Sequence, residues 1–317
     1  MSLIDETASG LFAIAVTPFS EDGSLDLQST DTMVDFYLES GCSGLTILGI
    51  MGEAQKLLPD EAVAFTKRVL SRSGNIPVVV GVSSPAFQPM ERLTKQVMDL
   101  GAAGVMLAPM GGLNTDLKIK NYFFAVAEFL GETPVVLQDY PPSSGVNISS
   151  NLLVNLFDEL PMLKVLKHED WPGLRKLTEF KRVQSQGKLR EVSVLAGNGG
   201  LFLPQELDRG ADGAMTGFAF PEMLAKVIKL YAEGAAPDAE DLFDCYLPLC
   251  KHEQQLGIGL ALRKETLFRR GVLSSPAIRA PGPALDVKDY SELSHLISRL
   301  YRRLSMSGYP TDFWKAE

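Results

Sequence analysis

Short apolar runs alternate with longer amphipathic segments along the first two thirds of the chain. Runs of this length that lack a polar alternation are typical of strands buried on both faces. We expect such strands at residues 11–16, 44–48, 76–80, 104–108, 133–138, 161–167, 192–196 and 212–216.

The segments between these runs carry apolar residues at helical spacing and stop at glycine or proline. In the first of them, Met33, Phe36 and Tyr37 share one face before Gly41 ends the pattern. We expect helices at residues 26–40, 59–73, 89–100, 116–130, 150–159 and 171–184, and a short one ending at residue 209. Beyond residue 235 only helical segments are expected, at 238–256, 259–270 and 288–304.

Strands that alternate with helices pair in parallel through crossovers. Eight such units over about 220 residues match a closed (β/α)₈ barrel. An open doubly wound sheet is the alternative, but the glycine cluster at 197–200 is too short and too late for its phosphate loop. The sequence therefore predicts an α/β fold, a TIM barrel at residues 1–234 followed by a C-terminal helical domain at 235–317.

One predicted strand, within residues 161–170, ends in a lysine. Alternation along a strand places Leu163, Val165 and Lys167 on one face, so the lysine is carried on apolar surroundings to the strand's C-terminal end. An amine desolvated in this way has a lowered pKa and can attack a carbonyl. A lone strand-end lysine more often extends to solvent, but active sites of barrels lie at this end of the strands.

Glycine-rich or polar segments follow several of the predicted strands, at residues 49–53, 138–145, 167–170 and 197–200. In a barrel these segments converge over one mouth. Glycines there let the backbone approach a ligand and leave amides free for an anion. The sequence therefore predicts an anion-binding site around Lys167.

The composition of the chain limits which kinds of molecule it is expected to bind and where in the cell it is expected to occur. The chain has 317 residues, 45% hydrophobic and 22% charged, with a formal net charge of −9, which argues against nucleic acid or an anionic membrane as partner. Its three cysteines lack metal-site spacing, so we expect no metal and a reduced, cytoplasmic protein. We find neither a signal peptide nor an apolar run of about 18 residues.

Together these residues resemble the dihydrodipicolinate synthase and N-acetylneuraminate lyase superfamily of pyruvate-dependent class I aldolases. The matching segments are residues 15–18, 41–44, 49–53, 77–81, 166–167 and 279–281. The resemblance implies a barrel with a C-terminal helical domain, a homo-oligomer (dimer or tetramer), and a 2-oxo acid such as pyruvate bound as an imine to Lys167. It implies no cofactor.

The chain departs from this family at the residues that transfer protons in the family's reaction. The two threonines of the carboxylate-binding turn are Ile50 and Met51, so backbone amides remain while a hydroxyl is lost. The family's catalytic tyrosine falls on Gln138, which cannot act as an acid or base. Tyr140 lies two residues further and could supply the phenol. His168, beside the lysine, is a further candidate proton carrier, although it could equally face away.

Other departures concern the second substrate. Ser143 stands where dihydrodipicolinate synthases have an arginine, and Met110 and Gly111 replace their tyrosine pair. The acidic pair of sialic acid lyases falls on Gly199 and Gly200. Neither of these two activities is favoured.

The predicted site is listed here by role. We expect Lys167 and Tyr140 to be catalytic. The expected substrate-binding residues are Gly49, Ile50, Met51, Gln138, Gly197 and Asn198. We expect Glu53 to fasten its own turn, and Glu169 and Asp170 to cap the next helix rather than orient the lysine.

Two classes of function remain. The first is a Schiff-base lyase, an aldolase or a hydro-lyase such as a deoxy-sugar acid dehydratase, that is similar to dihydrodipicolinate synthase without being one. The second is a non-catalytic protein that binds a 2-oxo acid as a sensor or partner. A binding protein has little use for a desolvated amine, so the lyase is favoured.

Overall fold

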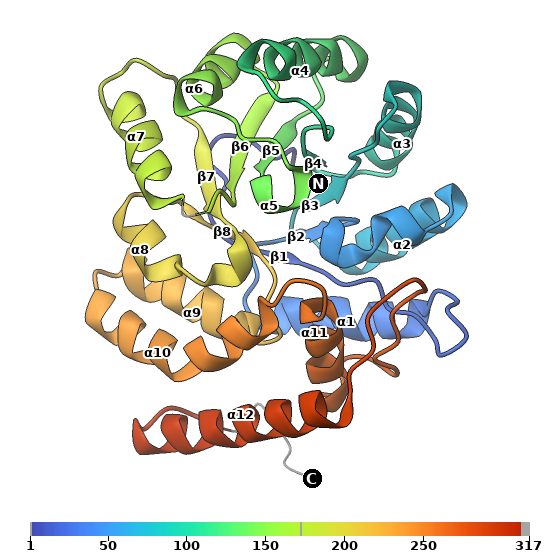
Figure 1. The fold of residues 1–317 in the computed structure, drawn as a ribbon, viewed down its shortest axis with the longest axis vertical. Coiled ribbons are helices and arrows are strands. Elements are labelled where there is room, and N and C mark those ends of the chain that lie inside the picture. Colours follow the sequence, from blue (N-terminus) through green and yellow to red (C-terminus); the bar gives the residue numbers. More distant parts are fainter. Residues whose placement is uncertain (1, 172, 312–317) are drawn as a thin grey trace.

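Eight parallel strands close into a barrel (Figure 1). The computed structural model describes residues 2–171 and 173–311. Each strand pairs with the next in chain order, and β8 pairs with β1. The strands are β1 (Gly10–Ile14), β2 (Gly44–Ile47), β3 (Val78–Gly81), β4 (Gly104–Leu107), β5 (Val135–Asp139), β6 (Leu163–His168), β7 (Ser193–Ala196) and β8 (Gly213–Thr216). The predicted barrel is confirmed.

Helices surround the barrel (Figure 1). They are α1 (Leu27–Glu39), α2 (Pro59–Arg72), α3 (Phe87–Asp99), α4 (Asp116–Leu130), α6 (Ser150–Glu159), α7 (Leu174–Ser185), α8 (Leu203–Asp208) and α9 (Pro221–Ala232). Short helical turns that the sequence did not predict follow three strands. These are η1 (Ile50–Gly52), η2 (Ala54–Lys56), α5 (Pro141–Ser144) and η3 (Asn198–Gly200).

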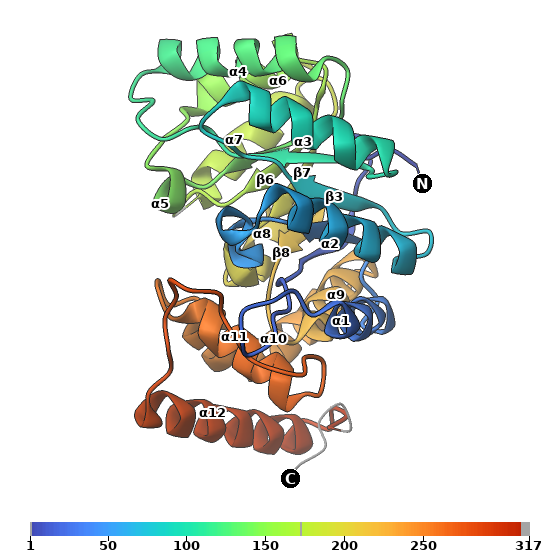
Figure 2. The same cartoon turned by 90° about the vertical axis from the view of Figure 1, so that its right-hand side faces the viewer.

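Three helices follow the barrel: α10 (Ala236–Glu253), α11 (Gly259–Arg269) and α12 (Val287–Met306). Figure 2 shows them gathered on one side of the molecule, next to α1 and α9, with α12 outermost. The predicted C-terminal helices are thus present, while a domain boundary at residues 234 and 235 stays a prediction. No helix in the described ranges is long and apolar enough to cross a membrane.

The core has two layers, one inside the barrel and one between the strands and the helices. The inner layer is a stack of side chains from alternate strand positions, namely Phe12, Ile14, Val79, Met106, Val136, Val165, Leu195 and Met215. Gln138 and Lys167 each lie two residues beyond an inner-layer valine, so both side chains point into the barrel mouth.

The prediction that Leu163 shares a face of β6 with Val165 and Lys167 is wrong. The pairing of β5 with β6 shifts by one residue, because Val135 lies opposite Leu163 while Val136 lies opposite Val165. Lys164 is therefore an extra residue in β6, and Leu163 packs in the outer layer. Beyond this bulge Gln138 lies opposite Lys167, which is the pairing that the site uses.

A buried ion pair fastens the C-terminal helices to the turn after β2. The Glu53 carboxylate accepts hydrogen bonds from Lys264 Nζ at 2.6 Å, Lys56 Nζ at 2.8 Å and the Arg279 amide at 3.1 Å. Lys264 also lies over the Phe19 ring. Glu53 was expected to fasten its own turn, and it also holds α11 against that turn.

The Lys264→Met variant tests this attachment. It leaves the buried Glu53 carboxylate with one ammonium partner fewer, and losing one member of a buried pair costs about 3–5 kcal/mol. We expect urea unfolding to show a fall of that size in the free energy of unfolding. The matched control is Lys288→Met, whose side chain is 82% exposed and which should change that free energy by less than about 0.5 kcal/mol. Equal effects of the two variants would contradict the role of the ion pair.

Candidate active site

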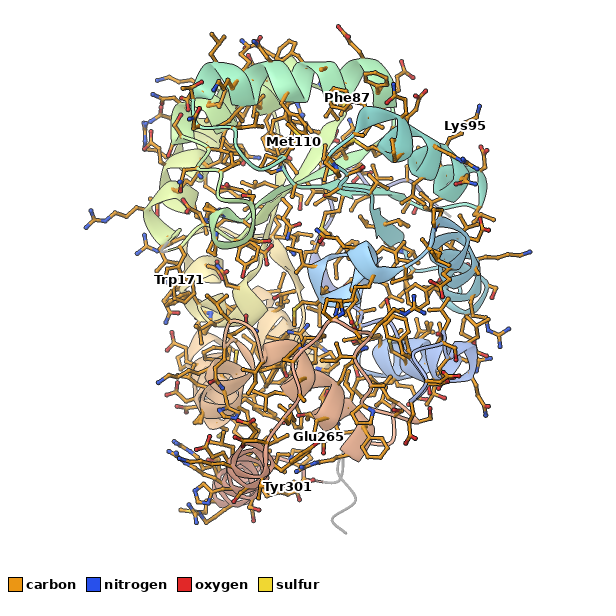
Figure 3. All side chains as sticks on the ribbon, turned by 45° about the vertical axis from the view of Figure 1, so that its right-hand side comes forward. Phe87, Lys95, Met110, Trp171, Glu265 and Tyr301 are labelled. Atoms are coloured by element: carbon orange, nitrogen blue, oxygen red, sulfur yellow. The ribbon has the colours of Figure 1, made fainter. Side chains whose placement is uncertain are left out.

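The ends of β5 and β6 place two polar side chains side by side in the barrel mouth. Gln138 and Lys167 occupy paired positions of the two strands, and each is only 4% exposed. Figure 3 labels Met110, which follows β4, and Trp171, which follows β6. Both are partly exposed.

The Glu169 carboxylate lies between these two side chains. Its Oε2 is 2.8 Å from Lys167 Nζ and accepts a hydrogen bond from Gln138 Nε2 at 2.6 Å. Its Oε1 accepts the Asn198 amide at 3.2 Å. The expectation that Glu169 caps the next helix is therefore wrong. Because Glu169 follows Lys167 by two residues, strand alternation could have placed it on the lysine's face.

The segment after β7 is shaped to receive this carboxylate. A Cβ on Gly197 would lie 1.9 Å from Glu169 Cγ, so only glycine leaves room for the side chain. Asn198 adopts a φ of 50°, and its amide donates to Glu169 Oε1. Gly197 and Asn198 thus lie beside Glu169, and their expected contact with the substrate stays a prediction.

The turn after β2 offers free backbone amides at the same end of the barrel. Ile50 and Met51 open η1, so their amides have no acceptor within it, and none is found elsewhere in the described residues. Met51 packs against the inner layer. A Cβ on Gly81 would lie 2.2 Å from the Leu48 carbonyl oxygen, so glycine there lets the backbone of this turn approach β3. The turn thus has two amides free to donate, and an anion-binding role for Gly49, Ile50 and Met51 stays a prediction.

Tyr140 and His168 make no hydrogen bond to Lys167 or Glu169 among the described residues. Tyr140 is half-buried at the start of α5, and burial, aided by the Glu169 charge, raises the pKa of its phenol. No hydrogen bond of this hydroxyl occurs within the described ranges. His168 lies on the opposite face of β6, where its Nε2 is 3.0 Å from the Gly173 carbonyl oxygen and burial lowers its pKa. The geometry does not bring His168 to the lysine.

A second ionic cluster lies behind the strand pair. Asp139 and His168 are paired on the outer face of β5 and β6, and Lys176 from α7 binds Asp139 Oδ2 at 2.6 Å. Lys176 Nζ is also 3.3 Å from the Asp170 carboxylate, which accepts a hydrogen bond from the Trp171 amide. Helix α7 begins at Leu174 and its N-cap, Gly173, has no side-chain cap bond, so the expectation that Asp170 caps this helix is wrong. Burial raises the pKa of Asp139 to about 6, although Lys176 acts in the opposite direction. This cluster ties the ends of β5 and β6 to α7.

Metal ligands do not gather in the part of the chain that the structure describes. No group of three or more histidine, cysteine, aspartate or glutamate side chains is placed there to hold an ion. The groups that the structure places together in the mouth are the Lys167 amine, the Glu169 carboxylate, the Gln138 amide side chain and the Asn198 backbone amide.

Comparisons with known proteins agree with this fold. The model of the dihydrodipicolinate synthetase family matches residues 7–300. The chain is 30% identical to an L-2-keto-3-deoxyarabonate dehydratase from Azospirillum brasilense over 296 residues, 92% of this chain and 94% of that protein. It is 29% identical to a 4-hydroxy-tetrahydrodipicolinate synthase from Oceanobacillus iheyensis over 74% of this chain and 78% of that protein. A crystal structure of dihydrodipicolinate synthase from Rhodopseudomonas palustris superposes with a TM-score of 0.93 at 47% identity, covering 94% of this chain and 100% of that one.

The outer cluster gives a pH dependence of stability. The pKa of Asp139 is about 6 in the folded chain, against an ordinary value of 3.8. Between these two pH values the carboxyl group is ionised in the unfolded chain and protonated in the folded chain. Stability is therefore lost as the pH rises through about 6, by about 2–3 kcal/mol at 1.36 kcal/mol per pKa unit. The Asp139→Asn side chain cannot titrate, so it serves as the reference. Denaturant unfolding should show the wild-type free energy of unfolding falling by this amount, relative to that of Asp139→Asn, between pH 4 and pH 7. The exposed control Asp208→Asn should follow the wild-type curve, and a constant difference between wild type and Asp139→Asn would refute the assignment.

Proposed function

The chain belongs to the dihydrodipicolinate synthetase family, and from that premise we propose that it removes water from a deoxy-sugar 2-oxo acid through a Schiff base. It is a lyase of the class I aldolase type. One observation carries the proposal: the Glu169 carboxylate lies 2.8 Å from Lys167 Nζ and 2.6 Å from Gln138 Nε2. Because Gln138 stands where the family has its catalytic tyrosine, the Glu169 carboxylate, which contacts the Lys167 amine, can transfer protons in place of that tyrosine.

Lys167 is the nucleophile in this proposal. Glu169 takes a proton from the ammonium group, and the neutral amine attacks the 2-oxo carbon. Loss of the carbonyl oxygen as water leaves an imine, whose positive charge makes the neighbouring C3–H acidic. The substrate carboxylate binds the amides of Ile50 and Met51 beside Gly49, because these donors lie at the same mouth and have no other acceptor in the described chain.

Glu169 then serves as both base and acid. It takes the C3 proton, which leaves an enamine, and returns this proton to the C4 hydroxyl as the C4–O bond breaks and water departs. Water adds to the resulting unsaturated imine and releases the product and the free lysine. Gln138 cannot exchange protons, but its amide holds Glu169 Oε2 in place. Tyr140, at the edge of the mouth, is assigned to contact the substrate hydroxyls.

The competing function is dihydrodipicolinate synthesis, which the names of other relatives describe. This chain has Ser143 where the family's synthases have an arginine, and Met110 and Gly111 where they have tyrosines. The relative that is 30% identical over nearly the whole chain is instead named a dehydratase. The non-catalytic alternative has no support in the comparisons. A homo-oligomer in the cytoplasm, as the resemblance implies, stays part of the proposal.

Imine formation is tested by trapping. Incubation with pyruvate and borohydride should add the mass of one reduced pyruvoyl group, and peptide mapping should place it on Lys167. The matched control is Lys164→Met, which removes the neighbouring lysine of the same strand and should trap normally, while Lys167→Met should not trap. An adduct on Lys164, or none in the wild type, would refute the Schiff base.

The proton carrier is tested by comparing Glu169→Gln with Tyr140→Phe and His168→Gln. We expect Glu169→Gln still to form the trapped pyruvate adduct, more slowly than the wild type, and to lose about 10²-fold or more in kcat, because general acid–base transfer contributes that much. His168→Gln should keep its turnover, since its ring lies behind the strand. A loss of this size in Tyr140→Phe, with turnover intact in Glu169→Gln, would return the role to the tyrosine that the sequence favoured.

Substrate preference is tested with two assays on the same preparation. Dehydration is measured with a set of 2-oxo-3-deoxy sugar acids, and synthase activity with pyruvate and aspartate semialdehyde. We expect turnover in the first assay. In the second the missing arginine removes a charge-assisted contact worth about 1.5–3 kcal/mol, so little activity should remain. Synthase activity within about tenfold of an ordinary family member, without dehydration, would contradict the proposal.

A further inference from the structure

Two segments that match the family have no task in the chemistry described above. They are residues 15–18, which follow β1, and residues 279–281, which lie between α11 and α12. Both segments bond to the turn after β2, which carries the free amides of Ile50 and Met51. The contacts with this turn indicate what the two segments do.

The first segment holds the turn through a buried hydroxyl group. Thr17 is fully buried, and its Oγ1 donates a hydrogen bond to the Gly52 carbonyl oxygen at 2.5 Å. A Cβ on Gly52 would lie 3.4 Å from the Ala15 carbonyl oxygen, so the turn packs directly on this segment. Ala15 is itself anchored, because its amide donates to the Thr46 carbonyl oxygen of β2 at 2.9 Å. The end of β1 thus holds the Gly52 peptide group in place.

The second segment holds the turn through Glu53. The Arg279 amide donates to Glu53 Oε2 at 3.1 Å. Lys56 Nζ donates to the same oxygen and to the Arg279 carbonyl oxygen, each at 2.8 Å. Lys264 Nζ joins Glu53 Oε1, at 2.6 Å, to the Ala277 carbonyl oxygen, at 2.8 Å. The φ of Glu53 is 53°, a left-handed conformation that is uncommon without glycine and that these contacts hold.

Gly52 and Glu53 are bonded to the peptide groups that carry the free amides. The Gly52 amide donates to the Gly49 carbonyl oxygen at 3.0 Å, and the Glu53 amide donates to the Ile50 carbonyl oxygen at 3.1 Å. The Gly49 carbonyl shares a planar peptide group with the Ile50 amide, and the Ile50 carbonyl shares the next one with the Met51 amide. The directions of the two free N–H bonds therefore depend on where Gly52 and Glu53 are held.

We propose that Thr17 and Glu53 are positioning residues that aim these two amides at the substrate carboxylate. The inference rests on the proposed role of the turn in binding that carboxylate, and both residues act through the turn rather than on the reacting atoms. A turn released at Gly52 or Glu53 presents its donors in the wrong direction, which weakens carboxylate binding. The contact of Lys167 with Glu169 does not involve either residue and is kept.

Thr17→Val separates positioning from folding. Valine keeps the branched shape and removes the hydrogen bond to Gly52, a loss worth up to about 10-fold in an equilibrium constant. The matched control is Thr66→Val, because Thr66 is also fully buried and its hydroxyl donates to the Ala62 carbonyl oxygen at 2.8 Å within α2. Both variants should lose similar stability in thermal unfolding. Only Thr17→Val should change pyruvate binding, and Thr17→Ser, which keeps the hydroxyl, should restore it.

The readout compares two ligands that differ in the carboxylate. Borohydride trapping on Lys167 is followed with increasing concentrations of pyruvate and of pyruvamide, in which an uncharged amide group replaces the carboxylate. In Thr17→Val we expect the half-saturating concentration of pyruvate to rise about 10-fold. The half-saturating concentration of pyruvamide and the trapping rate at saturation should stay as in the wild type. A general disturbance of the site would weaken both ligands alike.

Glu53→Gln tests the second attachment. It keeps the length of the side chain and removes the charge that binds Lys264 and Lys56, so it should lose stability and show the same selective rise for pyruvate. Equal shifts for pyruvate and pyruvamide in Thr17→Val, or an unchanged half-saturating concentration of pyruvate, would overturn the proposal.

A titration without imine formation separates this inference from the Schiff-base function. In Lys167→Met, proton NMR measures the non-covalent binding of pyruvate, and adding Thr17→Val should weaken that binding by about the same 10-fold factor. If the wild type traps no pyruvate, the Schiff-base function fails, while this titration still decides the role of Thr17. Equal affinities of the two Lys167→Met proteins for pyruvate would overturn the positioning role.

Discussion

The contact of the Glu169 carboxylate with Lys167 is the interaction on which the rest of the site depends. A buried carboxylate needs a positive partner and several donors, and the structure supplies the Lys167 ammonium, the Gln138 amide group and the Asn198 backbone amide. These donors come from β6, β5 and the segment after β7. Gly197 must lack a side chain so that the carboxylate fits. One ionic contact thus fixes the ends of three adjacent strands.

The two faces of the strand pair have separate tasks. On the inner face, Gln138 and Lys167 meet Glu169 in the barrel mouth. On the outer face, Asp139 and Lys176 form an ion pair that joins the same strand ends to α7. On the far side of the mouth, Glu53 and Lys264 hold the turn with free amides against α11. The C-terminal helices therefore support the turn that carries the free amides of Ile50 and Met51, even though they contribute no group to the proposed chemistry.

The sequence was sufficient to predict the barrel and to place Lys167 near the end of a strand at the barrel mouth. Repeated short apolar runs and a lysine at the end of such a run are local patterns. The sequence could not show the bulge at Lys164, because a register shift depends on how β6 pairs with β5. Leu163 was therefore assigned to the wrong face. Glu169 was taken for a helix cap, because a polar residue after a strand is typical of one. The predicted substrate-binding residues lie around the mouth, and their roles stay proposals.

Hydrogen exchange at the methyl group of pyruvate is the most direct test of a base acting on a Lys167 imine. Pyruvate has the 2-oxo acid group and the C3 protons, and it lacks a leaving group, so proton removal is observed alone. In deuterated water, proton NMR should show the wild type replacing the methyl protons with deuterium. Glu169→Gln should form the borohydride-trapped adduct and yet exchange at least about 10²-fold more slowly. Exchange at the wild-type rate in Glu169→Gln would contradict the central claim that this carboxylate moves the proton.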